Sequence, residues 1–261
     1  MAQKADKYVL YQKTVQDPVH EVGFFEKTYR QIFKRSPKVL REDFCGTFSV
    51  CCEWVKRRGR VAVGIDLDSE PLEWGRKHNL SKLSSEAQCR VKLMQQDVRS
   101  VNGLKADVLA AQNFSFWLFK TRDELRQYLR IARKNLSANG MMVLDMMGGP
   151  ESMEENHLDE RKYGKITYVW EQARFNPIDH SSEFYISFKF QDGSKLERVF
   201  GYHWRFWTIP EVRELLSEAG FSASYVYWEG TDKTGEGDGV YKKATIAGNE
   251  PAWIAYIVAI K

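Results

Sequence analysis

The sequence predicts a doubly wound α/β domain, a parallel sheet with helices on both faces, that carries an antiparallel insertion after its fifth strand. Two patterns indicate this. In the first 150 residues, short apolar segments alternate five times with segments of helical periodicity. Beyond residue 165, aromatic and polar residues alternate, as in half-buried antiparallel strands. Because parallel neighbours need crossover connections, the first pattern requires a sheet that is covered on both faces.

Local signals place the elements of the core. Asp17 and Pro18 begin a helix whose apolar stripe runs to Phe33, before Ser36 and Pro37 end it. Continuous apolar segments then predict strands at residues 38–40, 61–65, 91–94, 108–111 and 141–144.

A capping box marks the helix between the fourth and fifth strands. Thr121 and Glu124 have the required spacing at its start. The apolar periodicity continues to Leu136, so we expect this helix to end at Asn139 and Gly140.

The alternating region and the segment after it complete the fold. An antiparallel sheet is expected over residues 166–170, 184–190 and 196–206, with a turn at Asp192 and Gly193. Thr208 and Glu211 predict a second capped helix, followed by strands at 225–228 and 253–260. The chain is thus divided into an N-terminal segment and helix (1–37), a Rossmann-like core (38–150), the antiparallel insertion (151–207) and a C-terminal completion of the core sheet (208–261).

Composition narrows the function only slightly. The net charge of +4 is mild, so a nucleic-acid partner is not indicated. No apolar run has the length of a signal peptide or a membrane span, so a cytoplasmic protein without a membrane partner is expected. The cysteines are Cys45, Cys51, Cys52 and Cys89. They show neither a disulfide framework nor zinc-ligand spacing, and no metal is expected.

Acidic residues follow the first three predicted strands: Glu42, Asp66 and Asp97. In open parallel sheets, ligands bind beyond the carboxyl ends of the strands, near the switch point. A carboxylate after the second strand is placed to accept hydrogen bonds from the ribose hydroxyls of a nucleoside cofactor. Asp97 is placed to accept one from an adenine amino group.

The turn after the first strand distinguishes between cofactor types. It reads Glu-Asp-Phe-Cys-Gly-Thr-Phe over residues 42–48, with one glycine and two adjacent acids. A dinucleotide site needs a glycine-rich turn so that the backbone can approach a pyrophosphate. The acids would repel a pyrophosphate but tolerate a cofactor that carries an ammonium and a sulfonium group. NAD is therefore the weaker hypothesis.

Four strand-end segments resemble sequence motifs of the class I S-adenosylmethionine-dependent methyltransferases. In order and spacing they are similar to motifs I, II, III and V: Glu42 to Thr47, Gly64 to Asp68, Gln96 to Val98, and Leu144 with Asp145. The turn Leu-Arg-Glu-Asp-Phe-Cys-Gly-Thr further resembles that of bacterial methyltransferase-domain proteins of unassigned substrate. The resemblance implies S-adenosyl-L-methionine as the cofactor and methyl transfer as the reaction.

Transferred position by position, the resemblance implies a set of cofactor-binding residues. The set is Tyr11, Arg41, Glu42, Phe44, Cys45, Gly46, Thr47, Asp66, Leu67, Asp97, Val98 and Asn113. Within it, Leu67 would pack on the adenine, Val98 would join Asp97 at the adenine edge, and Asn113 would line the methyl-transfer face. Tyr11 lies ahead of the core, in a segment that either folds over the cofactor or forms a surface tail.

The first-strand turn would hold the methionine part of the cofactor. Arg41 would bind the methionine carboxylate, or it would pair with Glu42 or Asp43. Phe44 and Phe48 stand where the family usually has glycine, so the conformation of the loop is the point at which this sequence departs from the family.

The antiparallel insertion is similar to that of small-molecule N-methyltransferases, including those that act on nucleotide sugars. Its aromatic and charged residues suit a planar or cationic acceptor, and the candidate acceptor residues are Trp170, Glu171, Arg174, Tyr202, His203 and Arg205. His203 is the candidate base, which is needed only if the acceptor arrives protonated. The alternative is that the insertion packs as a structural lid or forms a homodimer interface.

The predicted function is therefore transfer of a methyl group to a nitrogen or oxygen of a small-molecule acceptor. Two other hypotheses stay open. An RNA or protein methyltransferase would need a basic groove. The only dense basic helix, with Arg122, Arg126, Arg130, Arg133 and Lys134, is more simply a solvated face. A non-catalytic protein on the same fold would bind the cofactor without turnover.

Overall fold

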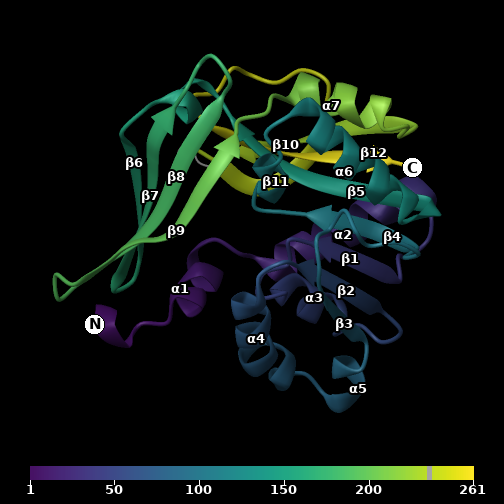
Figure 1. The fold of residues 1–261 in the computed structure, drawn as a ribbon, viewed down its shortest axis with the longest axis horizontal. Helices are drawn as coiled ribbons and strands as arrows, with labels where there is room; N and C mark the ends of the chain where they lie inside the picture. The colour runs from purple at the N-terminus through teal and green to yellow at the C-terminus, as the bar shows by residue number, and fades with distance from the viewer. Residues whose placement is uncertain (234–236) are drawn as a thin grey trace.

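The computed structural model describes residues 1–233 and 237–261 (Figure 1). Within them, eight strands form one mixed sheet, ordered β11-β10-β12-β5-β4-β1-β2-β3, and four strands form a separate antiparallel sheet, ordered β6-β7-β8-β9. The helices are α1 (Lys7–Thr14), α2 (Pro18–Phe33), α3 (Ser49–Trp54), α4 (Ser69–His78), α5 (Ser85–Gln88), α6 (Arg122–Lys134) and α7 (Ile209–Glu218). The strands are β1 (Val39–Asp43), β2 (Val61–Asp66), β3 (Val91–Gln95), β4 (Ala106–Ala111), β5 (Leu136–Gly148), β6 (His157–Tyr163), β7 (Ile166–Phe175), β8 (Ser181–Phe190), β9 (Lys195–Arg205), β10 (Ala223–Thr231), β11 (Gly237–Ala244) and β12 (Trp253–Ile260).

The large sheet has a switch point between β1 and β4. The chain builds β1, β2 and β3 outward in one direction, then returns to add β4 and β5 on the other side of β1, all parallel. β12 then inserts antiparallel between β5 and β10. Because ligands of open sheets bind at the carboxyl ends of strands beside such a point, this topology places a site beyond β1 and β4.

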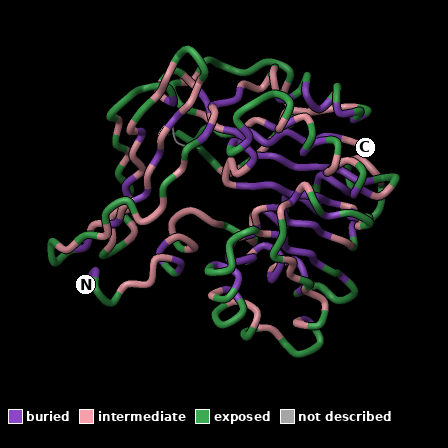
Figure 2. Tube along the Cα trace, viewed as in Figure 1, coloured by how far each residue is buried: buried purple, intermediate pink, exposed green. Residues whose placement is uncertain are grey.

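Successive residues of the central strands are buried on opposite faces. In β4, Leu109 packs with α6 and α7, whereas Val108 and Ala110 pack with α2 and α3. All three side chains are fully buried, which explains why the strand reads as one continuous apolar segment. Figure 2 shows this burial along the central strands of the large sheet. The prediction of a doubly wound sheet is confirmed.

The helix N-caps predicted from the sequence are confirmed for α2, α6 and α7. At the start of α2, the Asp17 side chain accepts a hydrogen bond from the backbone amide of His20, and Pro18 occupies the first turn. Both predicted capping boxes also form: Thr121 with Glu124 in α6, and Thr208 with Glu211 in α7.

One predicted boundary is wrong. The periodicity assigns Leu136 to a helix, but α6 ends at Lys134 and β5 begins at Leu136. The Asn135 side chain donates a 2.8 Å hydrogen bond to the carbonyl oxygen of Val101, and Leu136 pairs with Ala106 of β4. Pairing with a neighbouring strand therefore overrides the helical pattern.

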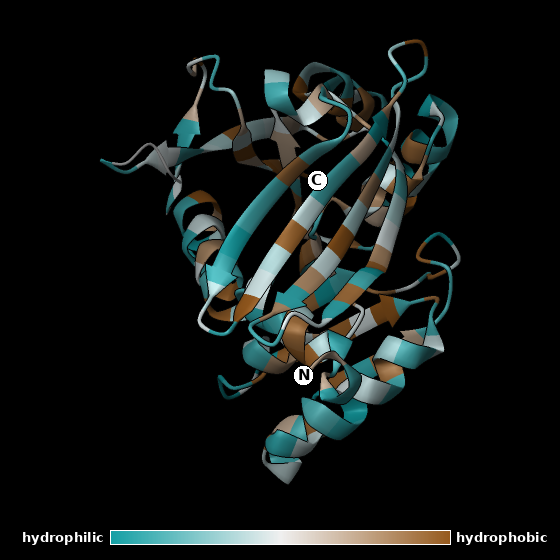
Figure 3. Ribbon diagram, turned by 90° about the vertical axis from the view of Figure 1, so that its left-hand side faces the viewer, coloured by the Kyte–Doolittle hydropathy of each residue, from teal (hydrophilic) through white to brown (hydrophobic). Residues whose placement is uncertain are grey.

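The four-stranded sheet, called the lid sheet below, stands beside the large sheet, and α1 lies between it and α4 (Figure 1). Figure 3 shows the lid sheet face on, with hydrophobic and hydrophilic residues alternating along its strands. The antiparallel insertion is thus confirmed. The structure adds β6, β11 and α1, which the sequence pattern did not indicate. In the part of the chain described here, no helix has both the length and the apolar character needed to cross a membrane.

Candidate active site

A cavity of about 890 Å³ lies among the lid sheet, the N-terminal segment and the ends of β4, β5, β10 and β12. Its lid wall is aromatic and includes Tyr168, Trp170, Tyr202 and Trp204. Polar groups of Glu21, Asn113 and Asp145 line other parts of the wall. The cavity therefore lies at the sheet edge that the topology selects for ligand binding.

The loop after β1 adopts a left-handed backbone at two phenylalanines. The φ angle is 57° at Phe44, 49° at Gly46 and 46° at Phe48, a region in which glycine is the usual residue. Both rings are anchored, because Phe44 lies 5.7 Å from the ring of Tyr128 and Phe48 is fully buried. The loop thus keeps the left-handed backbone that glycine usually adopts although two of its three left-handed positions are phenylalanines, and burial of the rings offsets the backbone strain.

Asp66, at the end of β2, is joined to this loop. Its Oδ2 accepts a 2.7 Å hydrogen bond from the amide of Gly46, and its Oδ1 accepts one of 2.9 Å from the amide of Asp68. Burial raises the pKa of Asp66, and the backbone donors partly oppose this. Each oxygen keeps a further lone pair, and the neighbouring Leu67 is 70% exposed. Asp66 can therefore accept hydrogen bonds from a ligand at the end of β2.

Asp97, which follows β3, is paired with Arg99, a residue that the sequence analysis did not single out. The Arg99 guanidinium donates hydrogen bonds of 3.1 Å to Oδ1 and 2.7 Å to Oδ2. These bonds hold the pKa of Asp97 below its usual range. An adenine amino group would meet an ion-paired carboxylate here rather than an unpaired one.

Glu42 is buried beside the start of α3, where its Oε2 accepts a 3.0 Å hydrogen bond from the amide of Cys51. Burial raises the pKa of Glu42 to about 7, with Asp66 and Asp43 adding to the effect and Cys51 opposing it. A cation placed beside Glu42 would favour its charged form. Cys45 is buried nearby, and burial also raises the pKa of its thiol.

Asp145, on β5, caps the turn after β4. Its oxygens accept hydrogen bonds from the amides of Asn113 at 2.7 Å and Phe114 at 2.9 Å. Both donors have left-handed backbone, with φ angles of 57° and 55°. Burial raises the pKa of Asp145 to about 7, although the two amides lower it. Asn113 is thereby held at the cavity wall.

Arg41 pairs with Asp43, which is the second of the two roles expected for it. The side chain is fully buried. Its Nε donates to Oδ1 of Asp43 at 2.6 Å, and its Nη2 donates to the carbonyl oxygen of Val98 at 2.8 Å. The Tyr128 hydroxyl donates to the same Asp43 at 2.9 Å. Arg41 instead joins β1, α6 and the segment after β3 in one buried network.

The N-terminal segment connects the lid sheet to the loop after β1, so the surface-tail hypothesis is wrong. Tyr11 lines the cavity, and its ring lies 4.9 Å from that of Phe200 on β9. The Gln12 amide donates a 2.7 Å hydrogen bond to Oγ1 of Thr47. The segment thus passes over the loop that the resemblance assigns to the methionine part of the cofactor.

The candidate acceptor residues fall on two faces of the lid sheet. Trp170 and Tyr202 line the cavity, and their rings lie 6.1 Å apart. Successive strand residues point to opposite faces, so Glu171 and His203 lie on the outer face. Glu171 accepts a 2.7 Å hydrogen bond from Arg198, and His203 is exposed. His203 is therefore not placed to act as a base in the cavity.

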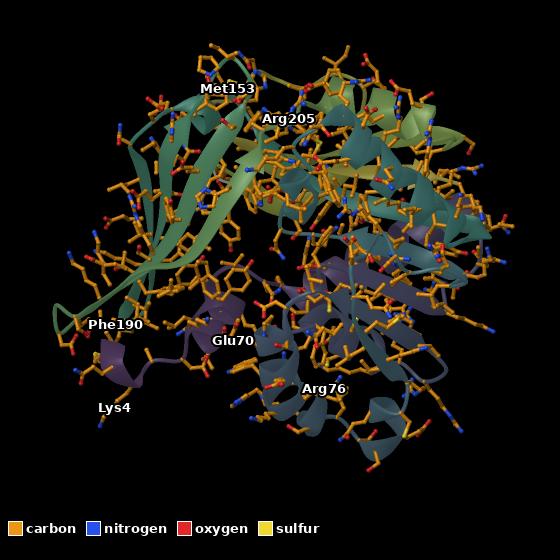
Figure 4. All side chains as sticks on the ribbon, viewed as in Figure 1. Lys4, Glu70, Arg76, Met153, Phe190 and Arg205 are labelled. Carbon is orange, nitrogen blue, oxygen red and sulfur yellow. The ribbon has the colours of Figure 1, made fainter. Side chains whose placement is uncertain are left out.

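Arg174 and Arg205 are also outside the cavity. The Arg174 side chain is 68% exposed and lies 4.0 Å from a carboxylate oxygen of Glu183. Arg205 donates a 3.1 Å hydrogen bond to Glu211 at the start of α7. In Figure 4, Arg205 lies where β9 meets the core, and Phe190 lies near the opposite end of the lid sheet. Of the six candidate acceptor residues, only the two aromatic ones line the cavity.

Further residues line the cavity that were not predicted from the sequence. Tyr241 of β11 and Tyr256 of β12 lie with their rings 4.3 Å apart, and Glu21 is buried in the first turn of α2. A signal existed for Glu21, because it precedes Phe25 by one helical turn and so lies on the buried stripe of α2. No local signal existed for the tyrosines, since strand order alone brings them together.

Comparisons with known proteins give structural neighbours only. No family model and no curated protein matches the sequence. An S-adenosylmethionine-dependent methyltransferase from Clostridium acetobutylicum ATCC 824 is similar, with a TM-score of 0.69, 16% identity and 96% of each chain covered. CalS10, an amino pentose methyltransferase from Micromonospora echinaspora, has a TM-score of 0.67 and 16% identity over 97% of this chain and 95% of its own. The sugar N-methyltransferase KedS8 from Streptoalloteichus sp ATCC 53650 has a TM-score of 0.64 and 15% identity over 98% and 93%.

These likenesses span nearly the whole chain at identities that establish the fold alone. The chain has the fold of the class I S-adenosylmethionine-dependent methyltransferases.

Proposed function

We propose that this protein is an S-adenosylmethionine-dependent methyltransferase that acts on a nitrogen or oxygen of a small-molecule acceptor. The observation that carries the proposal is the aromatic-lined cavity of about 890 Å³ between the lid sheet and the strand ends. Such a volume suits a small molecule rather than a nucleic-acid duplex. An amino pentose methyltransferase and a sugar N-methyltransferase among the similar structures support the same class of acceptor.

The residues present fit the cofactor. Asp66 offers acceptor oxygens for ribose hydroxyls, and Glu42 and Asp145 make the adjoining edge acidic, which suits an ammonium and a sulfonium group. When bound, S-adenosylmethionine supplies an already activated methyl group. The task of the chain is then to align the acceptor and exclude water, for which the N-terminal segment and lid sheet form a cover.

Calorimetry tests the cofactor assignment. We expect S-adenosylmethionine and its demethylated product, S-adenosylhomocysteine, to bind with roughly one-to-one stoichiometry and to raise the unfolding temperature by mass action. NAD should do neither. Tight NAD binding without binding of either adenosyl compound would reject the proposal.

A label-transfer screen tests the acceptor class. Lysate receives methyl-labelled cofactor with and without the protein, and is then separated into small-molecule, RNA and protein fractions. Label that appears only with the protein should enter the small-molecule fraction. Label in RNA or protein would support the macromolecular alternative, and cofactor binding without transfer would support a non-catalytic role.

Location in the cytoplasm and a homodimer through the lid sheet stay predictions. The outer face of that sheet carries charged pairs such as Glu171 with Arg198 and Glu160 with Lys189. Exposed pairs of this kind contribute little energy to association. Sedimentation velocity at several concentrations would show whether a dimer forms.

A further inference from the structure

Glu21 is a buried carboxylate with one oxygen that lacks a hydrogen-bond donor. It lies in the first turn of α2, is 7% exposed and lines the cavity. Among the described residues, none donates a hydrogen bond to its Oε2. Burying an ionised carboxylate without compensation is strongly unfavourable. The position therefore favours either a proton or a positively charged ligand.

The surroundings of Glu21 are acidic. Burial raises the pKa of Glu21 well above its ordinary value, and the carboxylates of Glu42 and Asp145 raise it further. Among the described residues that line the cavity, Arg161 is the only arginine or lysine, and it donates a 3.0 Å hydrogen bond to Asp159 on β6. The wall therefore attracts a cationic ligand more strongly than a neutral one.

Tyrosines from three elements line the same cavity as Glu21. They are Tyr11 of α1, Tyr241 of β11 and Tyr256 of β12. Burial raises the pKa of each phenol, and the charge of Glu21 contributes to the shift in all three. Aromatic faces attract cations, and an ammonium group has several donors for carboxylate and hydroxyl oxygens. The rings and the acid thus form one site for an ammonium group.

We propose that Glu21 binds the ammonium group of an amine acceptor and accepts its proton, so that the acceptors of this enzyme are amines. This proposal rests on the methyltransferase function proposed above. Transfer of the proton to Oε2 of Glu21 leaves a neutral amine with a free electron pair. That nitrogen then bonds to the methyl carbon, while the carbon–sulfur bond breaks and its electron pair stays on sulfur. The methylated nitrogen takes over the positive charge and can release a proton to water.

The cofactor has an ammonium group of its own, which could bind Glu21 in place of the ammonium group of the acceptor. Glu21 lines the same cavity as Tyr168 and Trp170 of the lid sheet, whereas Asp66, at the end of β2, does not line it. A nucleoside cofactor lies along that strand end in folds of this type. We therefore expect the acceptor, rather than the cofactor, to place its ammonium group between Glu21 and the lid sheet. The experiment below distinguishes these two ammonium groups.

The variant Glu21→Gln keeps the shape of the side chain and removes its charge. Glu197→Gln is the matched control, because Glu197 is on β9 of the lid sheet with its side chain 75% exposed. The probes are matched pairs that differ in one amino or hydroxyl group: glucosamine with glucose, benzylamine with benzyl alcohol, and cyclohexylamine with cyclohexanol. Three quantities are measured: the Kd of S-adenosylhomocysteine, the unfolding temperature of its complex with each probe, and labelled methyl transfer to each probe.

In the wild type and in Glu197→Gln, at least one amine should raise the unfolding temperature more than its alcohol and should receive label. Glu21→Gln should lose this transfer by at least about tenfold, the effect of removing a charged hydrogen-bond partner. Its Kd for S-adenosylhomocysteine should stay within about twofold of the wild type. Without ligands, Glu21→Gln should be at least as stable as the wild type, because glutamine needs neither a bound proton nor a buried charge at this position.

Three results would overturn the proposal. In the first, no amine exceeds its alcohol in the wild type. In the second, Glu21→Gln keeps full transfer to the amine. In the third, Glu21→Gln raises the Kd of S-adenosylhomocysteine by about tenfold or more, which would mean that Glu21 binds the ammonium group of the cofactor. Failure of the wild type to bind S-adenosylhomocysteine at all would instead reject the proposed function.

Discussion

The backbone amide of Gly46 donates a 2.7 Å hydrogen bond to Oδ2 of Asp66, which makes the loop after β1 and the end of β2 one structural unit. The amide of Asp68 fixes the other oxygen of the same carboxylate. A ligand bound at Asp66 therefore meets an acceptor whose orientation is already set. Binding such a preorganised group requires little ordering of the protein.

Asp66→Ala should raise the Kd of S-adenosylhomocysteine roughly tenfold or more. The hydroxyl donors of the ligand would lose their acceptor, and leaving such donors unpaired costs about 1 to 3 kcal/mol. Asp97→Ala should have a smaller effect, since Arg99 already occupies that carboxylate. Calorimetry gives both dissociation constants, and circular dichroism checks that the variants fold. An unchanged Kd for Asp66→Ala would mean that the adenosine half binds elsewhere.

Phe48→Gly should destabilise the protein even though glycine suits its backbone. Removing the left-handed strain gains about 1 to 2 kcal/mol, but losing a fully buried phenylalanine ring is unfavourable by about 3 to 5 kcal/mol. The free energy of unfolding in urea should therefore fall by about 1 to 4 kcal/mol. Phe44→Gly, whose ring is only partly buried, serves as the comparison and should lose less. A stabilised Phe48→Gly variant would contradict this balance.

Arg41→Met should destabilise the chain by about 3 to 5 kcal/mol, because it leaves the buried carboxylate of Asp43 without its ion-pair partner. The double variant with Asp43→Asn should recover part of the loss. If Arg41 has the structural role described above, the Kd of S-adenosylhomocysteine for the folded variant should change little. A large loss of cofactor affinity with normal stability would return Arg41 to the cofactor site.

Glu42→Gln should gain stability relative to the wild type as pH rises. The folded-state pKa of Glu42 is raised from 4.5 to about 7. The stabilising contribution of a raised carboxyl is complete below its unfolded pKa and is lost as pH rises through the folded value. Glutamine does not titrate, so the difference in the free energy of unfolding should shift by about 1 to 3 kcal/mol between about pH 4 and pH 8 without cofactor.

A difference that stays constant over this pH range would show that Glu42 does not titrate as described. Glu197→Gln, on the exposed lid surface, is the control and should show no such trend.

Substitutions on the two faces of the lid sheet should differ in their effect on methyl transfer. Tyr202→Ala should strongly reduce methyl transfer to the acceptor found by the label screen, because its ring lines the cavity. His203→Ala and Glu171→Ala, on the outer face, should keep activity and cofactor affinity. If His203→Ala abolished transfer while Tyr202→Ala did not, the face that meets the acceptor would be the outer one.

Interactions between near neighbours in the chain could be predicted from the sequence. The cap at Asp17 needs only the amide of His20, and the box at Thr121 needs only Glu124. The parallel strands were likewise predictable, because burial on both faces requires an unbroken apolar segment such as residues 61–65. The acidic strand ends further predicted the edge of the sheet at which a ligand would bind.

Only the tertiary structure decided which side chains meet at that edge. Trp170 and Glu171 are adjacent in sequence, yet packing of the lid sheet turns the first inward and the second to solvent. The sequence left two roles open for Arg41, cofactor binding or an ion pair. The structure decides for the ion pair, because α6 and the segment after β3 bury the side chain. The pKa of Glu21 is raised first by burial and then by the carboxylates of Glu42 and Asp145, and Asp145 is more than 100 residues away in the sequence. Burial and the nearby charges that act on each group arise from this long-range packing, which no local pattern of residues specifies.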